Sequence, residues 1–384
     1  MIRFFTAFTF EIDDPLLAAD EIRKQLDPEH SLLGNSAGLL FCSLDFVTSG
    51  AAAAVSKALP FGIIGCTTHG IVVPGGMSEV MLAVMVLTSD DAFFKIGVSD
   101  SLDEDGETRI REVYTRLSGP SESPPSLILA CYSNPNYFSG DEALNILDRV
   151  SGGIPVFGTS ALDETFGRRK PMIIHNGTAY SDRLALLTIC GGDQESRFNI
   201  KFLPAINFSG LPAVVTEARG NRLISINKMP AAEFMEKVGI IAEGKLNTIY
   251  GFPLMVNNND GTGPKSCGIY GIEDGGVLCC GSTIVKGATL KLVNQMREEV
   301  LSGSKHFVES IRKESGKKAH LICSCFGRGM SLVDLKDEMG LFQKHIEEQP
   351  YIFIYSAGEF CPVYDEVGGI RNGFYQYSIA AVSF

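Results

Sequence analysis

The sequence has no long hydrophobic run. Its longest apolar stretches, such as Val80–Leu87, are far shorter than the ~20 residues that a helix needs to cross a membrane. The N-terminus reads MIRFFTAFTFEIDD, with one arginine and a short apolar run before acidic residues, which is typical of a strand rather than a signal peptide. We therefore expect a cytoplasmic protein with neither a transmembrane helix nor a membrane partner.

Positive charge is also scarce. The chain has 33 lysines and arginines against 45 aspartates and glutamates, for a formal net charge of -12. A protein that binds nucleic acid or an anionic membrane would present a basic face, so the charge balance argues against both partners. Solubility explains the acidity, with an acidic binding surface as the alternative.

A CxxC pair is absent, although the chain has ten cysteines. Cys279 and Cys280 are adjacent, and Cys323 and Cys325 form a CxC pair; both spacings suit a metal poorly, since strand neighbours point to opposite faces. No CxxCH motif for haem attachment is present either. Free thiols within apolar strands act as small hydrophobic groups, so we expect a reducing compartment, no metal site and no cofactor.

What the sequence does contain is a block that occurs three times. Each copy has an apolar strand, a helical pattern, a second strand that ends in a turn of small hydroxyl or thiol residues with glycine, a polar excursion and a closing strand. The opening strands are Leu39–Leu44, Leu127–Cys131 and Leu321–Cys325, and the turn-bearing units begin at Phe61, Pro155 and Tyr351. At about 75 residues, the block exceeds the period of a solenoid repeat.

The fold class follows from this order of elements. The chain has 384 residues, of which 45% are hydrophobic and 20% charged, as in a globular protein of two or three domains with a substantial core. The blocks mix strand–helix–strand units with hairpins, so we predict an α/β or mixed α+β fold whose mixed sheets are covered by helices. A domain boundary is expected between Gly210 and Asn227.

The polar turns of the three blocks form the candidate ligand site. Short hydroxyl side chains and backbone amides in glycine turns bind carboxylates and phosphates well, and symmetric blocks would bring these turns to one pocket. The predicted residues are Cys66, Thr67, Thr68 and His69 in the first turn, Thr159, Ser160 and Asp163 in the second, and Glu359 in the third. The alternative role of the hydroxyl groups is to cap strand ends.

Arg328 stands at a glycine turn after an apolar strand. Its guanidinium group could hold the carboxylate of a ligand bidentately. It could equally pair with a buried acid such as Glu359 and tie the turns together, and the two roles are compatible.

Cys66 and His69 also suggest a nucleophilic thiol with an imidazole partner, as in a hydrolase or transferase. The sequence shows no orienting acid or oxyanion donor for them, so we expect a protein that is not an enzyme. His69 as the ligand of a haem is a further alternative, and a structural protein whose turns are packed shut is another.

The order of these motifs resembles that of the FIST family, whose members combine a FIST N and a FIST C domain. The resemblance is carried by Gly65–Gly70, Gly158–Ala161 with Asp163, Asn221, Leu223 and Ile226 before the Pro230-Ala231 helix, Cys325–Arg328 and Gly358–Phe360. It implies a FIST N-like domain over residues 1–215 and a FIST C-like domain over residues 216–384. The chain departs from the family pattern at its end, where Asn372–Tyr375 lead into an apolar strand, so no ligand contact is carried over to the last ten residues.

The resemblance implies a sensory function. FIST domains look like input modules that bind small ligands, with amino acids or related metabolites as the suggested ligands, and some members are haem-based gas sensors. Larger members place them before kinase, cyclase or chemotaxis output domains. This chain looks like a stand-alone member, so we expect it to signal through a separate partner such as a kinase, a cyclase or a chemotaxis component.

Overall fold

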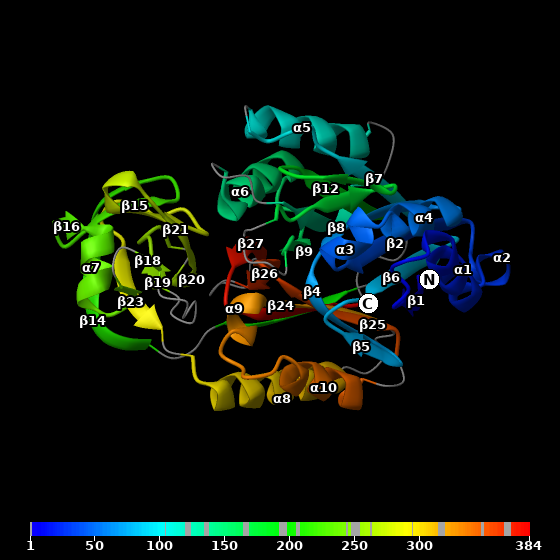
Figure 1. Ribbon diagram of the computed structural model, residues 1–384. Coiled ribbons are helices and arrows are strands. Elements are labelled where there is room, and N and C mark those ends of the chain that lie inside the picture. Colours follow the sequence, from blue (N-terminus) through cyan, green and yellow to red (C-terminus); the bar gives the residue numbers. More distant parts are fainter. Residues whose placement is uncertain are drawn as a thin grey trace.

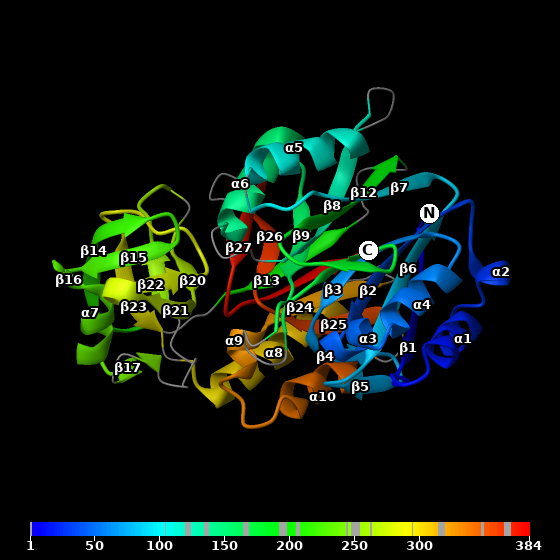
Figure 2. The ribbon, with the colours of Figure 1, turned by 45° about the horizontal axis from the view of Figure 1, so that its top comes forward.

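The chain folds into two parts that lie side by side in Figures 1 and 2. The computed structural model describes residues 2–103, 105–119, 124–133, 138–163, 169–191, 198–204, 208–242, 245–246, 254–261, 263–293, 295–313, 319–346, 349–364 and 370–384. Residues 208–293 form the smaller part, which we call the lobe (green to yellow, at the left of Figure 1), and the remaining residues form the body. The chain therefore enters and leaves the lobe only once.

The body contains three six-stranded sheets with the same arrangement of strands. The first sheet has the order β1 (Arg3–Thr9), β6 (Leu82–Ser89), β2 (Asn35–Cys42), β3 (Gly62–Thr67), β10 (Ile173–His175) and β11 (Thr178–Tyr180). The second has the order β7 (Ala92–Val98), β12 (Leu184–Gly191), β8 (Pro125–Tyr132), β9 (Val156–Ser160), β26 (Glu359–Tyr364) and β27 (Ile370–Tyr375). The third has the order β13 (Asn199–Leu203), β28 (Ile379–Ser383), β24 (His320–Cys325), β25 (Tyr351–Ser356), β4 (His69–Val73) and β5 (Gly76–Ser78).

Each sheet corresponds to one copy of the sequence block, with one exchange. A leading strand, a closing strand and a parallel pair come from one copy, and the parallel pairs are β2 with β3, β8 with β9, and β24 with β25. The edge hairpin comes from another copy. Hairpin β4–β5 of the first copy joins β25 of the third, β26–β27 of the third joins β9 of the second, and β10–β11 of the second joins β3 of the first. The three copies are thus linked in a closed cycle.

The sheets are buried on both faces, which explains their continuous apolar sequences. Their inner faces share one central core, in which Leu39, Leu129 and Leu321 come from the three opening strands. Helices cover the outer faces and form a separate core with each sheet. They are α1 (Pro15–Leu26), α3 (Leu44–Thr48) and α4 (Ala51–Ala58) on the first sheet, α5 (Gly106–Leu117) and α6 (Gly140–Ser151) on the second, and α8 (Arg297–Arg312), α9 (Phe326–Gly329) and α10 (Lys336–His345) on the third. The predicted class, mixed sheets covered by helices, is confirmed.

Three of the covering helices, α1, α5 and α6, begin at side-chain caps. Asp14 accepts hydrogen bonds from the backbone N–H groups of Leu16 and Leu17 at the start of α1, which satisfies donors that have no partner within the helix. At the start of α6, Ser139 and Glu142 form a reciprocal capping box. A further single turn, α2 (Pro28–Ser31), follows α1. None of the helices in the described ranges combines the length and apolar content that a membrane crossing needs.

The lobe has a core of its own. Its sheet runs β20 (Lys265–Cys267), β19 (Leu254–Asn257), β23 (Thr289–Val293), β14 (Phe208–Arg219), β15 (Arg222–Ile226), β22 (Val277–Cys280) and β21 (Ile269–Glu273), with β16 (Met229–Pro230) beside β15. It also contains α7 (Ala231–Lys237), the pair β17 (Ile241–Ala242) and β18 (Lys245–Leu246), and the short helix η1 (Asp274–Gly276). The expected boundary at residues 215/216 falls within β14, and residues after the lobe return to the body. The predicted division into a FIST N-like domain (residues 1–215) and a FIST C-like domain (residues 216–384) therefore describes sequence families rather than the two structural parts, and it stays a prediction.

Candidate functional site

The polar turns that follow β3, β9 and β25 meet inside the body. Three hydrogen bonds join them in a cycle, so each turn is bonded to the other two. These bonds run from Leu162 N to Thr67 O (2.9 Å), from Ala357 N to Ser160 O (3.0 Å) and from the Thr68 hydroxyl to Tyr355 O. Loops that lie far apart in the chain therefore converge. They do so because the three sheets exchange hairpins.

The hydroxyl groups at this junction are buried. Thr67, Thr68, Thr159 and Ser160 are each at most 2% exposed. The Thr67 hydroxyl accepts a hydrogen bond from Met172 N at 3.0 Å, and the Thr159 hydroxyl donates to Ser160 O at 3.3 Å. These contacts hold the ends of strands together, which is the alternative role that the sequence allows, and a direct contact with a ligand stays a prediction.

Cys66 lies in the central core rather than at a surface. Burial raises the pKa of its thiol well above the ordinary value, and the neighbouring Cys131 thiol raises it further. A neutral, buried thiol is a poor nucleophile. Within the described residues, moreover, no group of three or more His, Cys, Asp or Glu side chains is arranged to hold a metal ion.

The His69 side chain contacts Glu79 and Phe326. Its Nε2 lies 3.4 Å from Glu79 Oε2, and its ring packs edge-on against Phe326 with the ring centroids 5.4 Å apart. These contacts lend no support to the nucleophile or haem alternatives.

Arg328 pairs with a buried acid, but the acid is not the one that the sequence suggested. Its Nη2 lies 3.0 Å from Glu338 Oε1, and the two side chains are 2% and 0% exposed. Nη2 also donates to the Ser304 hydroxyl at 2.7 Å, while Glu338 Oε2 accepts from the Tyr355 hydroxyl at 2.7 Å. Of the two roles that the sequence allows, the structure shows the pairing with a buried acid, and that acid is Glu338 of α10 rather than Glu359.

Glu359 is held by two serines instead. Its Oε1 accepts a hydrogen bond from the Ser356 hydroxyl at 2.6 Å, and its Oε2 accepts one from the Ser378 hydroxyl at 2.5 Å. Burial raises the pKa of the carboxyl group from 4.5 to about 8, and the serine hydrogen bonds and the charge of Arg328 offset only part of this rise.

This pKa predicts a pH-dependent stability. The folded chain keeps a proton that the unfolded chain releases near pH 4.5, so the stabilisation from the protonated Glu359 carboxyl is fully present below pH 4.5 and is lost as the pH rises through about 8. Between these values, the free energy of unfolding of the wild type should fall relative to that of Glu359→Gln, by up to about 1.4 kcal/mol per pH unit. Urea unfolding of both proteins from pH 5 to pH 9 measures the difference; parallel profiles would contradict it.

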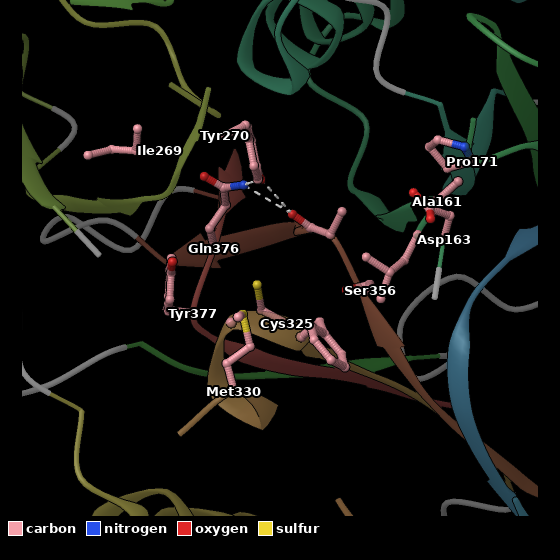
Figure 3. A pocket seen from close by; sticks show the side chains of 14 residues that line it. Ala161, Asp163, Pro171, Ile269, Tyr270, Cys325, Met330, Ser356, Gln376 and Tyr377 are labelled. Atoms are coloured by element: carbon pink, nitrogen blue, oxygen red, sulfur yellow. Dashed lines mark hydrogen bonds between the residues drawn. The ribbon is translucent and has the colours of Figure 1, made fainter. Parts of the chain in front are cut away.

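A cavity of about 270 Å³ lies above the second and third turns, where the lobe meets the body. Its walls combine five segments of the body with one strand of the lobe. The lining residues are Ala161, Leu162, Asp163, Pro171, Ile269, Tyr270, Cys325, Phe326, Gly327, Met330, Ser356, Ala357, Gln376 and Tyr377. Figure 3 shows Asp163 with Ala161 and Pro171 on one side, and Tyr270, Gln376 and Tyr377 on the other.

Gln376 connects the body to the lobe at the edge of this cavity. Its Oε1 accepts a hydrogen bond from Gly268 N of the lobe at 2.9 Å. Its Nε2 donates to Ala357 O of the third turn at 3.0 Å and also contacts the Tyr270 hydroxyl of the lobe. Tyr270 donates in turn to Ala357 O at 3.2 Å, as the dashed lines in Figure 3 indicate. The Gln376 side chain thus links the lobe directly to the third turn.

Tyr377 of the cavity wall has an unusual backbone conformation and close contacts. Its φ of 55° lies in the left-handed region, which is unusual for a bulky side chain and is often found at functional sites. The ring lies so close to Gly327 that an added Cβ there would come within 2.5 Å of it. It also packs on Met255 of the lobe. The strained backbone therefore presents an aromatic face at the point where lobe and body meet.

Of the predicted site residues, Asp163 lines the cavity, and the turn residues Thr67, Thr68, Thr159, Ser160 and Glu359 are buried in the body. The motif Cys325–Gly327 also lines the cavity, and in Figure 3 the Cys325 sulfur points into it. The prediction from the sequence left out Tyr270, Gln376 and Tyr377, two of which lie in the last ten residues. No local pattern marks them, because docking of the lobe creates their part of the wall.

The chain thus has two parts with a cavity of about 270 Å³ at their junction. The model of the FIST N domain matches residues 36–229, and that of the FIST C domain matches residues 231–362. The chain belongs to the FIST family, whose domains are associated with sensory signal transduction. No curated protein matches the chain.

Proposed function

We propose that this protein senses a small polar metabolite with an amino group, such as an amino acid or a related amine, and reports its presence to a separate signalling protein. The observation that carries the proposal is the cavity of about 270 Å³ whose wall is shared by lobe and body. Ligand sites are found preferentially at such junctions between domains.

The size and walls of the cavity indicate the ligand. Its volume is slightly below the roughly 300–1,000 Å³ of sites for drug-sized ligands, which favours a molecule about the size of an amino acid. Phe326, Tyr270 and Tyr377 supply aromatic faces, and Asp163 supplies a carboxylate. Aromatic faces and a carboxylate both attract an ammonium group, while the apolar walls suit a hydrocarbon chain.

The same position suggests how binding is reported. A molecule in the cavity touches the lobe at Ile269 and Tyr270 and touches the body at the second and third turns. It therefore adds contacts across a junction that is otherwise held by polar groups such as Gln376. We propose that a cytoplasmic partner, such as a kinase, a cyclase or a chemotaxis component, recognises the lobe in its ligand-stabilised position.

A thermal-shift screen of amino acids, amines and carboxylates tests the proposal. We expect amines and amino acids to raise the melting temperature, and Asp163→Asn to weaken the strongest of them by about tenfold or more, because a charged hydrogen bond is lost. Isothermal titration calorimetry measures this loss.

The matched control is Asp13→Asn, which removes an exposed carboxylate beside α1. It should bind like the wild type. Equal affinities of wild type and Asp163→Asn, or a screen without any stabilising compound, would count against the cavity as the sensory site.

A further inference from the structure

A second cavity, of about 190 Å³, lies at another point of contact between lobe and body. Its walls come from the first turns of α6, from the lobe segments around β20 and Thr283, and from β27. Its lining differs from that of the first cavity because charged residues of both signs contribute to it: Asp141, Asp260, Lys265 and Arg371.

The acidic groups of this lining and the amides of Asn258 and Asn372 already have partners within the protein. Asp141 accepts a hydrogen bond from Thr283 N at 3.1 Å, and its other oxygen lies 3.6 Å from Lys265 Nζ. Asn258 bonds to Thr283 O and to Val285 N. Asp260 is exposed at the rim and also interacts with other residues of the chain.

The Asn372 amide is engaged in the same way. It donates to Asp148 Oδ1 at 2.6 Å and to Ile154 O at 2.8 Å, and it accepts from Val156 N at 2.8 Å. The Asp141 carboxylate and the amides of Asn258 and Asn372 are therefore used to hold the protein together.

The two cations retain donors for a ligand. Lysine has three donors and arginine has five, and the ion pair of Lys265 with Asp141 accounts for one of the lysine's donors. The Arg371 side chain is exposed and makes no ion pair with any residue that the structure describes. Lys265 belongs to the lobe and Arg371 to the body, so an anion between them would contact both parts.

We propose that this second cavity binds a small anion, whose carboxylate or phosphate group is held by Lys265 of the lobe and Arg371 of the body. The guanidinium fork matches both groups, and the small volume admits only a compact molecule. Such an anion strengthens the contact between lobe and body at a point separate from the amine site. The inference does not depend on the ligand of the first cavity.

Calorimetric titration of the full chain with succinate and with inorganic phosphate, at constant ionic strength, tests this site. We expect at least one of the two anions to bind, and the stronger one identifies the preferred group. Succinamide, which has the shape of succinate without its charge, should not bind. Arg371→Gln should weaken the binding by about tenfold or more, and because Arg371 is exposed this variant should fold normally.

Two further variants test whether the loss of anion binding is specific to Arg371. Arg219→Gln removes another exposed arginine, on the hairpin between β14 and β15 of the lobe, and should bind the anion like the wild type. Asp163→Asn should also leave anion binding unchanged, although it weakens amine binding. Equal anion affinities of wild type and Arg371→Gln, binding of succinamide as strong as that of succinate, or no binding of either anion would overturn the proposal.

Discussion

Arg328→Met should lower the free energy of unfolding by about 3–5 kcal/mol, since it leaves the charge of Glu338 buried without its cationic partner. Glu338 is fully buried, and it accepts hydrogen bonds from Ser304, Ser324 and Tyr355 as well as from Arg328. The serines and the tyrosine can orient the carboxylate but cannot neutralise it. Denaturant unfolding of the purified variant measures the loss.

The matched control is the ion pair between Arg297 and Asp337. It has a short distance of 2.7 Å, but its side chains are 38% and 36% exposed. Water screens such a pair, so Arg297→Met should cost no more than about 1 kcal/mol. Similar losses of unfolding free energy in the two variants would show that burial of the Arg328–Glu338 pair does not determine how much it contributes to stability.

Gly65→Ala and Gly158→Ala should each prevent normal folding of the body. An added Cβ at Gly65 would lie 1.7 Å from Leu40 O, and one at Gly158 would lie 2.0 Å from Ala130 O. In each case the oxygen belongs to the backbone of the adjacent parallel strand, which cannot move without opening the central core. We expect a loss of about 4 kcal/mol or more, seen as a large drop in the yield of soluble, monodisperse protein.

Gly340→Ala is the control for this effect. Gly340 lies within α10, and an added Cβ there meets no atom within 4 Å. Alanine favours a helix by about 1 kcal/mol over glycine, so the melting temperature should stay the same or rise. Well-folded Gly65→Ala and Gly158→Ala proteins would mean that the parallel strands tolerate a separation that the structure does not show.

Much of the body could be predicted from the sequence. The apolar runs Leu39–Leu44, Leu127–Cys131 and Leu321–Cys325 mark the opening strands, of which the first ends at Cys42, before Leu44 begins α3. Their shortness favours a strand buried on both faces over a buried helix. The exchange of hairpins could not be predicted in the same way. A hairpin's sequence shows that it forms, but its partner strand depends on how the three sheets pack around the shared core.

The candidate site was predicted only in part for a related reason. Small hydroxyl residues mark the turns that converge, as Thr67 and Ser160 do, but the same residue types serve equally well to bond one turn to another inside the body. The open space lies beside these turns, where the lobe contacts Gln376 and Tyr377. Because segments far apart in the sequence form this wall together, no motif with a fixed spacing predicts it.

The most direct test of ligand binding between lobe and body is a crystal structure of the full chain with the strongest compound from the thermal-shift screen. We predict that the compound occupies the cavity of about 270 Å³, with its ammonium group at Asp163 and its apolar part against Tyr377 and Phe326. A compound bound elsewhere, with the cavity unchanged, would contradict the proposed sensory site.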